Sequence, residues 1–219
     1  MRGLLAGYIP IMLDCEGKRC VVVGGGKVAE RKAASLVEAK ADVVVISPTL
    51  TTSMAQWQEA GLIKWIARPY EYGDLQEALL IYAATNSVEI NRQVAKEAAE
   101  LRIPVNIVTS QEEGTFMSPS VMRRGKLIIA VSTTGAGPAA AKEIRHQLEH
   151  EFGDEYEKYT EFLYRIRSVV QSKVSDPVRR HTLLKAAATM DILNSIRAGS
   201  FDWWSDEEIE SWIIQTQGE

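Results

Sequence analysis

Cysteine and histidine are scarce in this sequence, and their scarcity excludes two classes of protein. Two cysteines, Cys15 and Cys20, and three histidines among 219 residues allow neither a disulfide framework nor a cysteine-rich zinc site. We interpret both cysteines as small buried apolar residues that flank a turn. His146 and His150 are spaced like metal ligands on one helical face, but their charged neighbours favour a solvated surface, so we predict no metal site.

Long apolar runs and an excess of positive charge are also missing. No run reaches the ~20 residues of a membrane span, and the apolar N-terminus contains Pro10 and Asp14 and has no convincing cleavage site. The net charge is −4, and lysine and arginine are spread along the chain, so no global basic field attracts nucleic acid or an anionic membrane. We therefore expect a cytoplasmic protein that binds neither nucleic acid nor a membrane.

The sequence does contain a regular alternation of short apolar runs with helical segments. Hydrophobic residues make up 46% and charged residues 25% of the chain, which is typical of soluble globular proteins. Buried strands are predicted at residues 19–23, 42–46, 62–67, 79–83 and 105–108, with helices at 27–39 and after Thr52 and Ser87. This alternation predicts an α/β fold with a Rossmann-like, doubly wound parallel sheet.

Beyond this sheet the pattern changes to one of helices. A strand at 127–132 precedes a helix that begins at Pro138, a first-turn position that proline tolerates. A capping box from Ser205 to Glu208 and a stop at Gly199 indicate further helices. The predicted organisation has three parts: a dinucleotide-binding domain at 1–113, a mixed segment at 114–150 and a helical C-terminal domain at 151–219.

A glycine-rich loop joins the first predicted strand to the first helix. Gly24, Gly26 and Ala29 fit the G-x-G-x-x-G/A spacing of dinucleotide-binding proteins. In that context the first glycine makes the tight turn, the second lets the backbone approach a pyrophosphate, and the small third residue lets helix and strand pack closely. The helix N-terminus offers N–H groups and a positive dipole end to the phosphates. The alternative is a glycine turn that serves packing alone.

The acidic residue that usually binds the adenine ribose is missing from the second strand. Ser47 stands in its place, no arginine is adjacent, and this leaves NAD and NADP both open on physical grounds. Thr85 and Asn86 follow the fourth strand, at the edge where ligands collect in such sheets. An equally weighted alternative is that Asn86 or Ser87 caps the next helix.

Four motifs together resemble one family. The runs YIPIMLDCEGKRCVVVGGGKVAERKA, YAATNSVEINRQV, PVNIV and SPSVMRRGKLIIAVSTTGAGPAAAKEIRHQLE are similar to the precorrin-2 dehydrogenase family of siroheme synthesis. The resemblance covers about the first 150 residues closely and the helical C-terminal part loosely. Together these motifs are far more specific than the glycine loop alone.

The resemblance implies NAD-dependent oxidation of precorrin-2 to sirohydrochlorin, in siroheme or cobalamin biosynthesis, by a homodimer whose segment 114–150 swaps between subunits. Some members also insert ferrous iron, so a bifunctional dehydrogenase and ferrochelatase is the alternative. Carried onto this sequence, the resemblance predicts cofactor contacts from Gly24, Gly25, Gly26, Lys27, Val28, Ser47, Pro48, Thr49, Thr85 and Asn86.

The sequence departs from the family at its expected acid. Many members have an aspartate where this chain has Thr109, followed by Ser110. We list Thr109, Ser110 and Ser132 as the candidate catalytic positions, with ordinary loop and capping chemistry as the alternative for the first two. The absent acid also suggests a second alternative function, a non-catalytic sensor or carrier that binds NAD and a tetrapyrrole.

The substrate of this family carries several carboxylate groups, which local positive charge would bind. Arg123, Arg124, Ser132 and Thr133 are the predicted substrate contacts. Arginine suits carboxylate pairing, and the two hydroxyl residues match a serine-rich turn of the family. Solvated charge for the arginines and helix capping for the hydroxyls are the alternatives.

Overall fold

The computed structural model describes residues 7–110 and 112–216. The chain separates into two compact units, Met1–Ser118 and Pro119–Glu219, and each is described by itself. The division into three domains at residues 113 and 150 stays a prediction. Within the described residues, no helix combines the length and the apolar character that crossing a bilayer requires.

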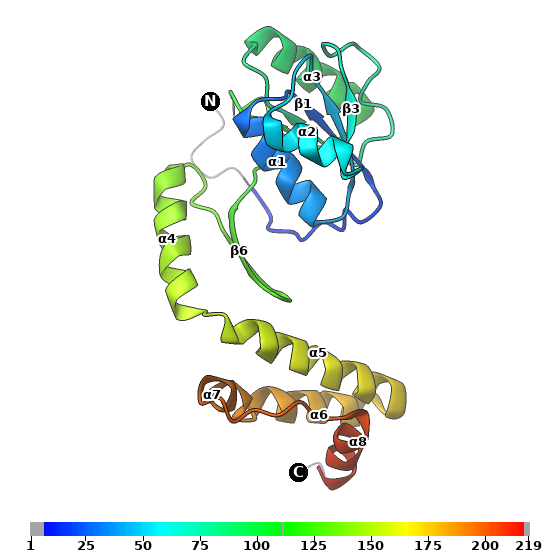
Figure 1. Ribbon diagram of the computed structural model, residues 1–219, viewed down its shortest axis with the longest axis vertical. Helices are drawn as coiled ribbons and strands as arrows, with labels where there is room; N and C mark the ends of the chain where they lie inside the picture. The colour runs from blue at the N-terminus through cyan, green and yellow to red at the C-terminus, as the bar shows by residue number, and fades with distance from the viewer. Residues whose placement is uncertain (1–6, 111, 217–219) are drawn as a thin grey trace. The chain divides into compact units, whose positions relative to one another are not determined.

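The first unit is a parallel sheet with helices on both faces (Figure 1). Its strands are ordered β3-β2-β1-β4-β5 and all adjacent pairs are parallel, so the predicted Rossmann-like class is confirmed. The elements in chain order are β1 (Arg19–Val23), α1 (Lys27–Glu38), β2 (Asp42–Ile46), α2 (Thr52–Glu59), β3 (Lys64–Ile66), β4 (Leu80–Ala83), α3 (Val88–Leu101) and β5 (Val105–Ile107).

Two separate apolar clusters explain why the central strands of this sheet bury apolar residues on both faces. Val22 and Val45 pack on one face of the sheet with α1 and α2, whereas Val21 and Val44 pack on the other face with α3. Successive side chains of a strand point to opposite faces, so a sheet covered on both sides buries all of them. Both cysteines are free and buried, as predicted, and they join the cluster under α1.

The observed strands differ most from the predicted ones in two places, at the β3 edge of the sheet and near the middle of the sequence. The strand expected at 62–67 is limited to β3 (Lys64–Ile66), which pairs on one side only, with β2. An unpredicted strand, β6 (Ser120–Arg124), pairs antiparallel with β7 (Leu127–Val131) around Gly125. Its sequence SVMRR gave no apolar signal, because only Met122 is buried.

The second unit combines this β6–β7 hairpin with helices. Its helices are α4 (Pro138–Glu151), α5 (Glu155–Lys173), α6 (Pro177–Thr189), α7 (Ile192–Arg197) and α8 (Asp206–Gln215). The helices α5 and α6 lie side by side (Figure 1), and Phe162, Ile166 and Leu183 centre an apolar core that α8 completes. Pro138 in the first turn of α4 and the capping box at Ser205 are confirmed.

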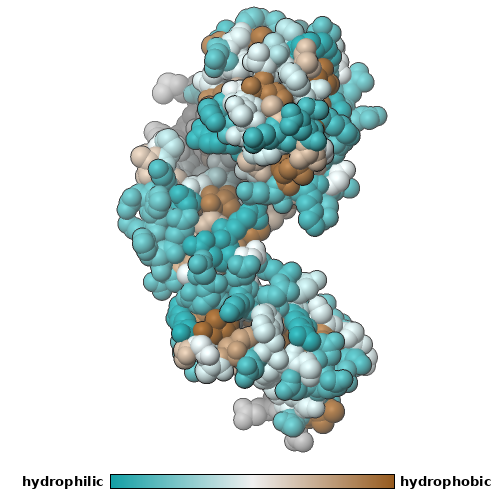
Figure 2. All heavy atoms as spheres, viewed as in Figure 1, coloured by the Kyte–Doolittle hydropathy of each residue, from teal (hydrophilic) through white to brown (hydrophobic). Residues whose placement is uncertain are grey.

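The visible surface is mainly hydrophilic (Figure 2), because most apolar side chains lie in these cores. Figure 2 shows a visible face on which hydrophilic residues predominate and hydrophobic residues form small separate patches.

The glycine predicted to stop a helix, Gly199, follows α7 with a φ of 70°, a left-handed conformation that favours glycine.

Candidate functional site

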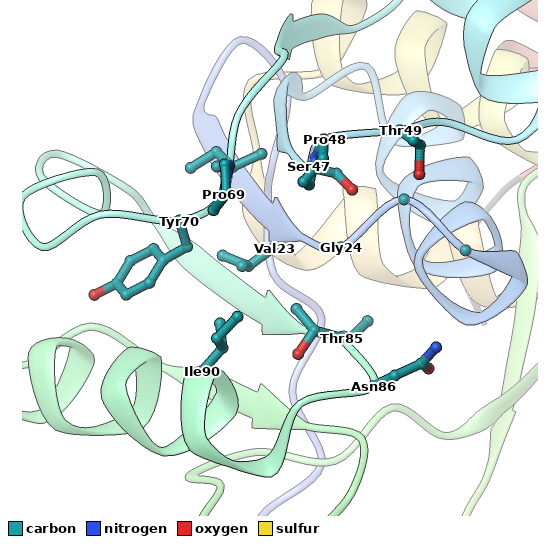
Figure 3. Close-up of a pocket in the computed structure, with 14 residues that line it drawn as sticks. Val23, Gly24, Ser47, Pro48, Thr49, Pro69, Tyr70, Thr85, Asn86 and Ile90 are labelled. Carbon is teal, nitrogen blue, oxygen red and sulfur yellow. The ribbon is translucent and has the colours of Figure 1, made fainter.

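The first unit contains a pocket of about 340 Å³ at the carboxyl ends of β1, β2 and β4 (Figure 3). The chain leaves β1 toward β2 and β3, then crosses back to β4, so the pocket lies at the point where the strand order reverses. Open α/β sheets bind ligands at such a point. The lining residues are Val23, Gly24, Gly25, Gly26, Ile46, Ser47, Pro48, Thr49, Pro69, Tyr70, Ala84, Thr85, Asn86 and Ile90.

The three consecutive glycines of the loop meet different surroundings. Gly24 has a φ of 126°, and a Cβ there would overlap the carbonyl of Ala84. A Cβ on Gly25 would overlap the carbonyl oxygen of Thr49. A Cβ on Gly26 would meet no heavy atom within 4 Å. The chain itself therefore requires the first two glycines, whereas the open face of Gly26 leaves room for a ligand.

Helix α1 begins directly after this loop and presents its N-terminus to the pocket. Gly26 is the N-cap and supplies no side-chain hydrogen bond to the first turn. First-turn N–H groups without such a cap, together with the helix dipole, form an anion site. Ala29 is fully buried against the sheet, in the close packing predicted for the third position of the motif. Both features suit a pyrophosphate.

The side chains of Lys27 and Val28, which the sequence places among the cofactor contacts, are partly directed elsewhere. Lys27 is exposed and forms an ion pair with Glu30 at 3.2 Å, and Val28 is 36% exposed. A hydrogen bond from Thr51, supported by Lys27, lowers the pKa of Glu30. Neither residue is among those that line the pocket, so any contact with a bound cofactor would come from the backbone N–H groups at the start of α1.

The loop after β2 forms one wall of the pocket and is held from β3. Ser47 is buried, and its carbonyl oxygen accepts a hydrogen bond of 2.8 Å from Nε1 of Trp65. Its N–H donates to the carbonyl of Ile66 at 3.2 Å. Pro48 and Thr49 continue this wall, opposite Thr85 and Asn86 (Figure 3). The predicted residues from β1, β2 and β4 are thus brought together around one cavity.

The lining residues of this pocket carry no charged side chain. The nearest guanidinium in sequence, that of Arg68, is bound by both carboxylate oxygens of Asp74 at 2.8 and 2.6 Å. This pairing with Arg68 lowers the pKa of Asp74. A ligand in the pocket is therefore met by backbone groups, hydroxyls and one carboxamide rather than by cations.

A second wall, formed by Pro69 and Tyr70, was not predicted from the sequence. Glu97 on α3 is 1% exposed and accepts hydrogen bonds from the hydroxyl of Tyr70 and from the N–H groups of Gly73 and Leu75. Burial and the hydrogen bond to Glu97 raise the pKa of Tyr70. This buried carboxylate fixes the loop between β3 and β4.

The connection from β4 to α3 is also held by a buried polar side chain. Ser87 is the N-cap of α3 and accepts a hydrogen bond of 3.3 Å from the N–H of Ile90, so Asn86 is not the cap. Asn91 is fully buried and bonds both the backbone and the hydroxyl of Thr85. Asn91 could not be identified from the sequence, because a lone asparagine within a helix carries no recognisable pattern.

The two hydroxyl residues at the position of the expected acid lie just after β5. The Thr109 hydroxyl accepts a hydrogen bond of 3.1 Å from Nδ2 of Asn91. The N–H of Ser110 donates to the carbonyl of Ile107 at 3.3 Å. The nearby carboxylate of Glu113 forms an ion pair with Arg92 at 3.3 Å.

The remaining candidates belong to the second unit, on and after the β6–β7 hairpin. Arg123 and Arg124 end β6, and Arg124 lies 3.1 Å from a carboxylate oxygen of Asp154. Ser132 accepts a hydrogen bond from the N–H of Thr134, and the hydroxyl of Thr133 donates to Gly137. Both hydroxyls thus shape the turn that leads into α4.

The histidines of α4 are exposed side chains in this unit. His146 lies 3.3 Å from Glu149, which also pairs with Arg145. Throughout residues 7–110 and 112–216, no group of three or more His, Cys, Asp or Glu side chains is arranged to hold a metal ion.

Comparison with known proteins identifies both parts of the chain. Residues 11–120 match an NAD(P)-binding family model, and residues 124–151 match the central domain of sirohaem biosynthesis proteins. A siroheme synthase of Methylobacillus flagellatus is 36% identical over 172 residues, which are 78% of this chain and 37% of that protein. The chain thus spans little more than a third of the length of such relatives.

Two further proteins match over most of their own length. A precorrin-2 dehydrogenase of Priestia megaterium is 30% identical over 174 residues, which are 80% of this chain and 86% of that protein. The solved structure of SirC, a precorrin-2 dehydrogenase, shares 27% identity, covers 95% of this chain and all of that one, and superposes with a TM-score of 0.74. The chain therefore belongs to the family of the precorrin-2 dehydrogenases and siroheme synthases, with an NAD(P)-binding first unit.

Proposed function

We propose that this protein is an NAD-dependent dehydrogenase that oxidises precorrin-2 to sirohydrochlorin in siroheme or cobalamin biosynthesis. The observation that carries this proposal is the pocket at the strand-order reversal, which Gly26 lines and where a Cβ on Gly26 would meet no heavy atom within 4 Å. The substrate is proposed from the names of two matching proteins. A relative that matches over most of its length and the matching solved structure are both called precorrin-2 dehydrogenase. Bound NAD would accept the hydride that leaves the substrate carbon.

The charge of the pocket supports the proposal of NAD rather than NADP. A 2′-phosphate is usually met by an arginine near the end of the second strand. Here that position is Ser47, the lining side chains are uncharged, and Arg68 is bound to Asp74. A hydroxyl can bond the ribose of NAD, whereas no lining cation would neutralise an added phosphate. The proposed contacts are those predicted from Gly24 to Val28, Ser47 to Thr49, and Thr85 and Asn86.

The substrate contacts that we propose come from the second unit. Precorrin-2 carries carboxylate side chains, and arginine binds carboxylates through two parallel hydrogen bonds. Arg123 and Arg124 supply this chemistry, and Ser132 and Thr133 supply hydroxyls. Because Arg124 is paired with Asp154, a substrate carboxylate would replace that partner. We also propose that the protein is a cytoplasmic homodimer, which sizing by light scattering and cell fractionation would test.

The pocket has no carboxylate that could remove the proton that the substrate loses on oxidation. The lining residues contain no Asp or Glu, and Thr109 replaces the acid of many family members. A general base typically contributes about 10²–10⁴-fold, whereas holding reactants in the reactive geometry can contribute more. We therefore propose that positioning of the substrate carbon against NAD supplies most of the rate. Thr109, Ser110 and Ser132 would act as hydrogen-bonding groups, and water would take the proton.

A bifunctional enzyme is the second candidate function, because several relatives that match this chain are named siroheme synthase. One anaerobic experiment separates the candidates. Purified protein is mixed with enzymatically generated precorrin-2 and NAD, and the absorbance of NADH and the spectrum of sirohydrochlorin are followed together, with and without ferrous iron.

Formation of NADH in step with sirohydrochlorin is the expected result. Iron insertion faster than in the enzyme-free control would add the ferrochelatase function. If protein shown to bind NAD forms no NADH above the enzyme-free control, the dehydrogenase proposal is wrong and the sensor or carrier function is favoured.

A further inference from the structure

The side chain that links the pocket to the position of the expected acid is Asn91, in the first turns of α3. It is fully buried, yet every polar atom of its carboxamide has a partner. A buried polar group that is completely satisfied defines one local arrangement, because any other would leave a donor or acceptor unpaired. Asn91 contacts two residues to which the proposed function gives a role, Thr85 and Thr109.

The backbone of Thr85 fixes the orientation of this carboxamide. The N–H of Thr85 donates to Oδ1 of Asn91 at 3.3 Å, and Nδ2 donates to the carbonyl of Thr85 at 3.1 Å. An N–H can only donate and a carbonyl can only accept, so the amide oxygen and nitrogen cannot be exchanged. The Thr85 hydroxyl lies 2.8 Å from the same Oδ1. This clamp holds Thr85 at the wall of the pocket, where Figure 3 shows it.

The same orientation decides what the hydroxyl of Thr109 can do. Nδ2 carries only donors, so Thr109 Oγ1 is the acceptor of their 3.1 Å bond. Its own hydrogen is then left for another acceptor, and within the described part of the chain no protein group accepts it. Thr109 is an exposed residue after β5. Its hydroxyl therefore presents a donor outward, not a base.

We propose that Asn91 is a positioning residue: its carboxamide holds Thr85 at the nucleotide pocket and sets the Thr109 hydroxyl as a hydrogen-bond donor to an oxygen acceptor of the substrate, a carboxylate. This inference rests on the proposed dehydrogenase function. It also gives Thr109 a role at the position where the family resemblance leads us to expect an acid. A threonine hydroxyl would donate a hydrogen bond to the substrate, whereas a carboxylate would accept one.

The test uses Asn91→Asp, Thr109→Val, the double variant and a matched control. Asn106→Asp is the control, because Asn106 also donates a hydrogen bond from Nδ2 to a backbone carbonyl, that of Phe116, but does not line the pocket. NAD affinity is measured by calorimetry, kcat and KM for precorrin-2 by NADH formation, and folding by thermal unfolding.

Each of the four variants has its own expected result. Thr109→Val lowers kcat/KM for precorrin-2 about tenfold, because one hydrogen bond to the substrate is lost. The NAD affinity of this variant stays within about twofold of wild type. Asn91→Asp weakens NAD binding about tenfold, because its carboxylate faces the carbonyl of Thr85. It also attracts the Thr109 hydrogen inward, so Thr109→Val has no further effect in that background. Asn106→Asp changes stability alone.

The proposal is overturned if Thr109→Val costs the same factor in both backgrounds, or if Asn91→Asp and Asn106→Asp weaken NAD binding equally. Thr109→Ser tests the hydroxyl without relying on Asn91 variants that fold, and it should restore kcat/KM to within about threefold of wild type. Absence of turnover by the wild-type protein would overturn the dehydrogenase function and the role of Thr109. The NAD affinities would then still decide whether Asn91 positions Thr85.

Discussion

The nucleotide pocket of the first unit and the β6–β7 hairpin of the second unit are both proposed to bind anionic molecules, but they use opposite means. The pocket has no charged lining residue and offers a helix N-terminus, backbone groups and hydroxyls. The hairpin carries the cations Arg123, Arg124 and Lys126. Arg124 forms an ion pair with Asp154, the N-cap of α5, and Lys126 forms one with Glu161 of α5.

This difference teaches how each ligand would be recognised. A pyrophosphate can be held by N–H groups whose positions the backbone fixes, so glycine spacing is enough to find its site. Carboxylates spread around a macrocycle need cationic side chains to bind them. In the free protein those cations pair with acidic residues, which the carboxylates of the substrate must replace on binding. Substitutions should therefore affect the pocket through shape and the hairpin through charge.

The largest effect is expected from adding a methyl group to the middle glycine of the loop. Gly25→Ala should destabilise the protein by about 3 kcal/mol, the upper range for overpacking, because its Cβ overlaps the carbonyl of Thr49. Gly26→Ala, the matched control, should remain within about 1 kcal/mol of wild type, since its Cβ meets no heavy atom within 4 Å. Urea unfolding measures both. Equal destabilisation would show that the two glycines do not differ as described.

The next effect concerns the wall that Glu97 holds. Glu97→Ala should cost about 2–3 kcal/mol, because it leaves the Tyr70 hydroxyl and two backbone N–H groups unpaired. It should also weaken NAD binding, since Tyr70 lines the pocket.

A comparable tyrosine–glutamate pair on the surface, between the β3–β4 loop and α3, supplies the control. Glu100 accepts a hydrogen bond from Tyr72 at 2.5 Å, and both residues are exposed. Glu100→Ala should change stability by less than about 0.5 kcal/mol and leave NAD binding unchanged. A similar loss in both variants would argue that burial of Glu97 has no special role.

Removal of charge from the hairpin should have a moderate effect on a different ligand. Arg123→Ala combined with Arg124→Ala should raise KM for precorrin-2 about tenfold or more, because charged hydrogen bonds to carboxylates are lost. NAD affinity should not change.

Arg92→Ala, which removes an arginine of the first unit that forms an ion pair with Glu113, is the control and should leave KM for precorrin-2 within about twofold. Added salt should raise the wild-type KM in the same direction as the double substitution. An unchanged KM in the double variant would remove these arginines from the substrate site.

The smallest effect is expected from the buried thiols at alkaline pH. Burial, with a further contribution from Cys15, raises the pKa of Cys20 to about 12. The folded protein therefore favours the neutral thiol. The resulting stabilisation is complete below the ordinary value of 9.0 and is lost as the pH rises toward about 12.

Cys20→Ala should be less stable than wild type at neutral pH, but its urea midpoint should fall less steeply above pH 9.0. Parallel slopes for the two proteins would contradict a raised pKa in the folded state.

The sheet and the glycine loop could be predicted because both depend on local patterns. Apolar runs such as 42–46 alternate with helices, and the G-x-G-x-x-A spacing predicts a loop between a strand and a helix, where Gly24 and Gly26 lie. The strand β6 could not be found in this way, since its residues are mostly polar or exposed and are held by pairing with β7.

The side chains that support the pocket were missed for a related reason. Tyr70 and Glu97 are 27 positions apart, and Asn91 and Thr109 are 18 apart. Each pair is brought together only when the loops at the carboxyl edge of the sheet meet α3. Within the sequence, a glutamate or asparagine in an amphipathic helix looks like part of its solvated face.

The proposed function requires that a dinucleotide bind against the open face of Gly26, and titration of NAD into the wild-type protein and the Gly26→Asp variant is the decisive measurement. The folded variant should lose at least about two orders of magnitude in affinity, because an aspartate fills the pyrophosphate position and repels its charge. Equal NAD affinity of the two folded proteins would contradict it.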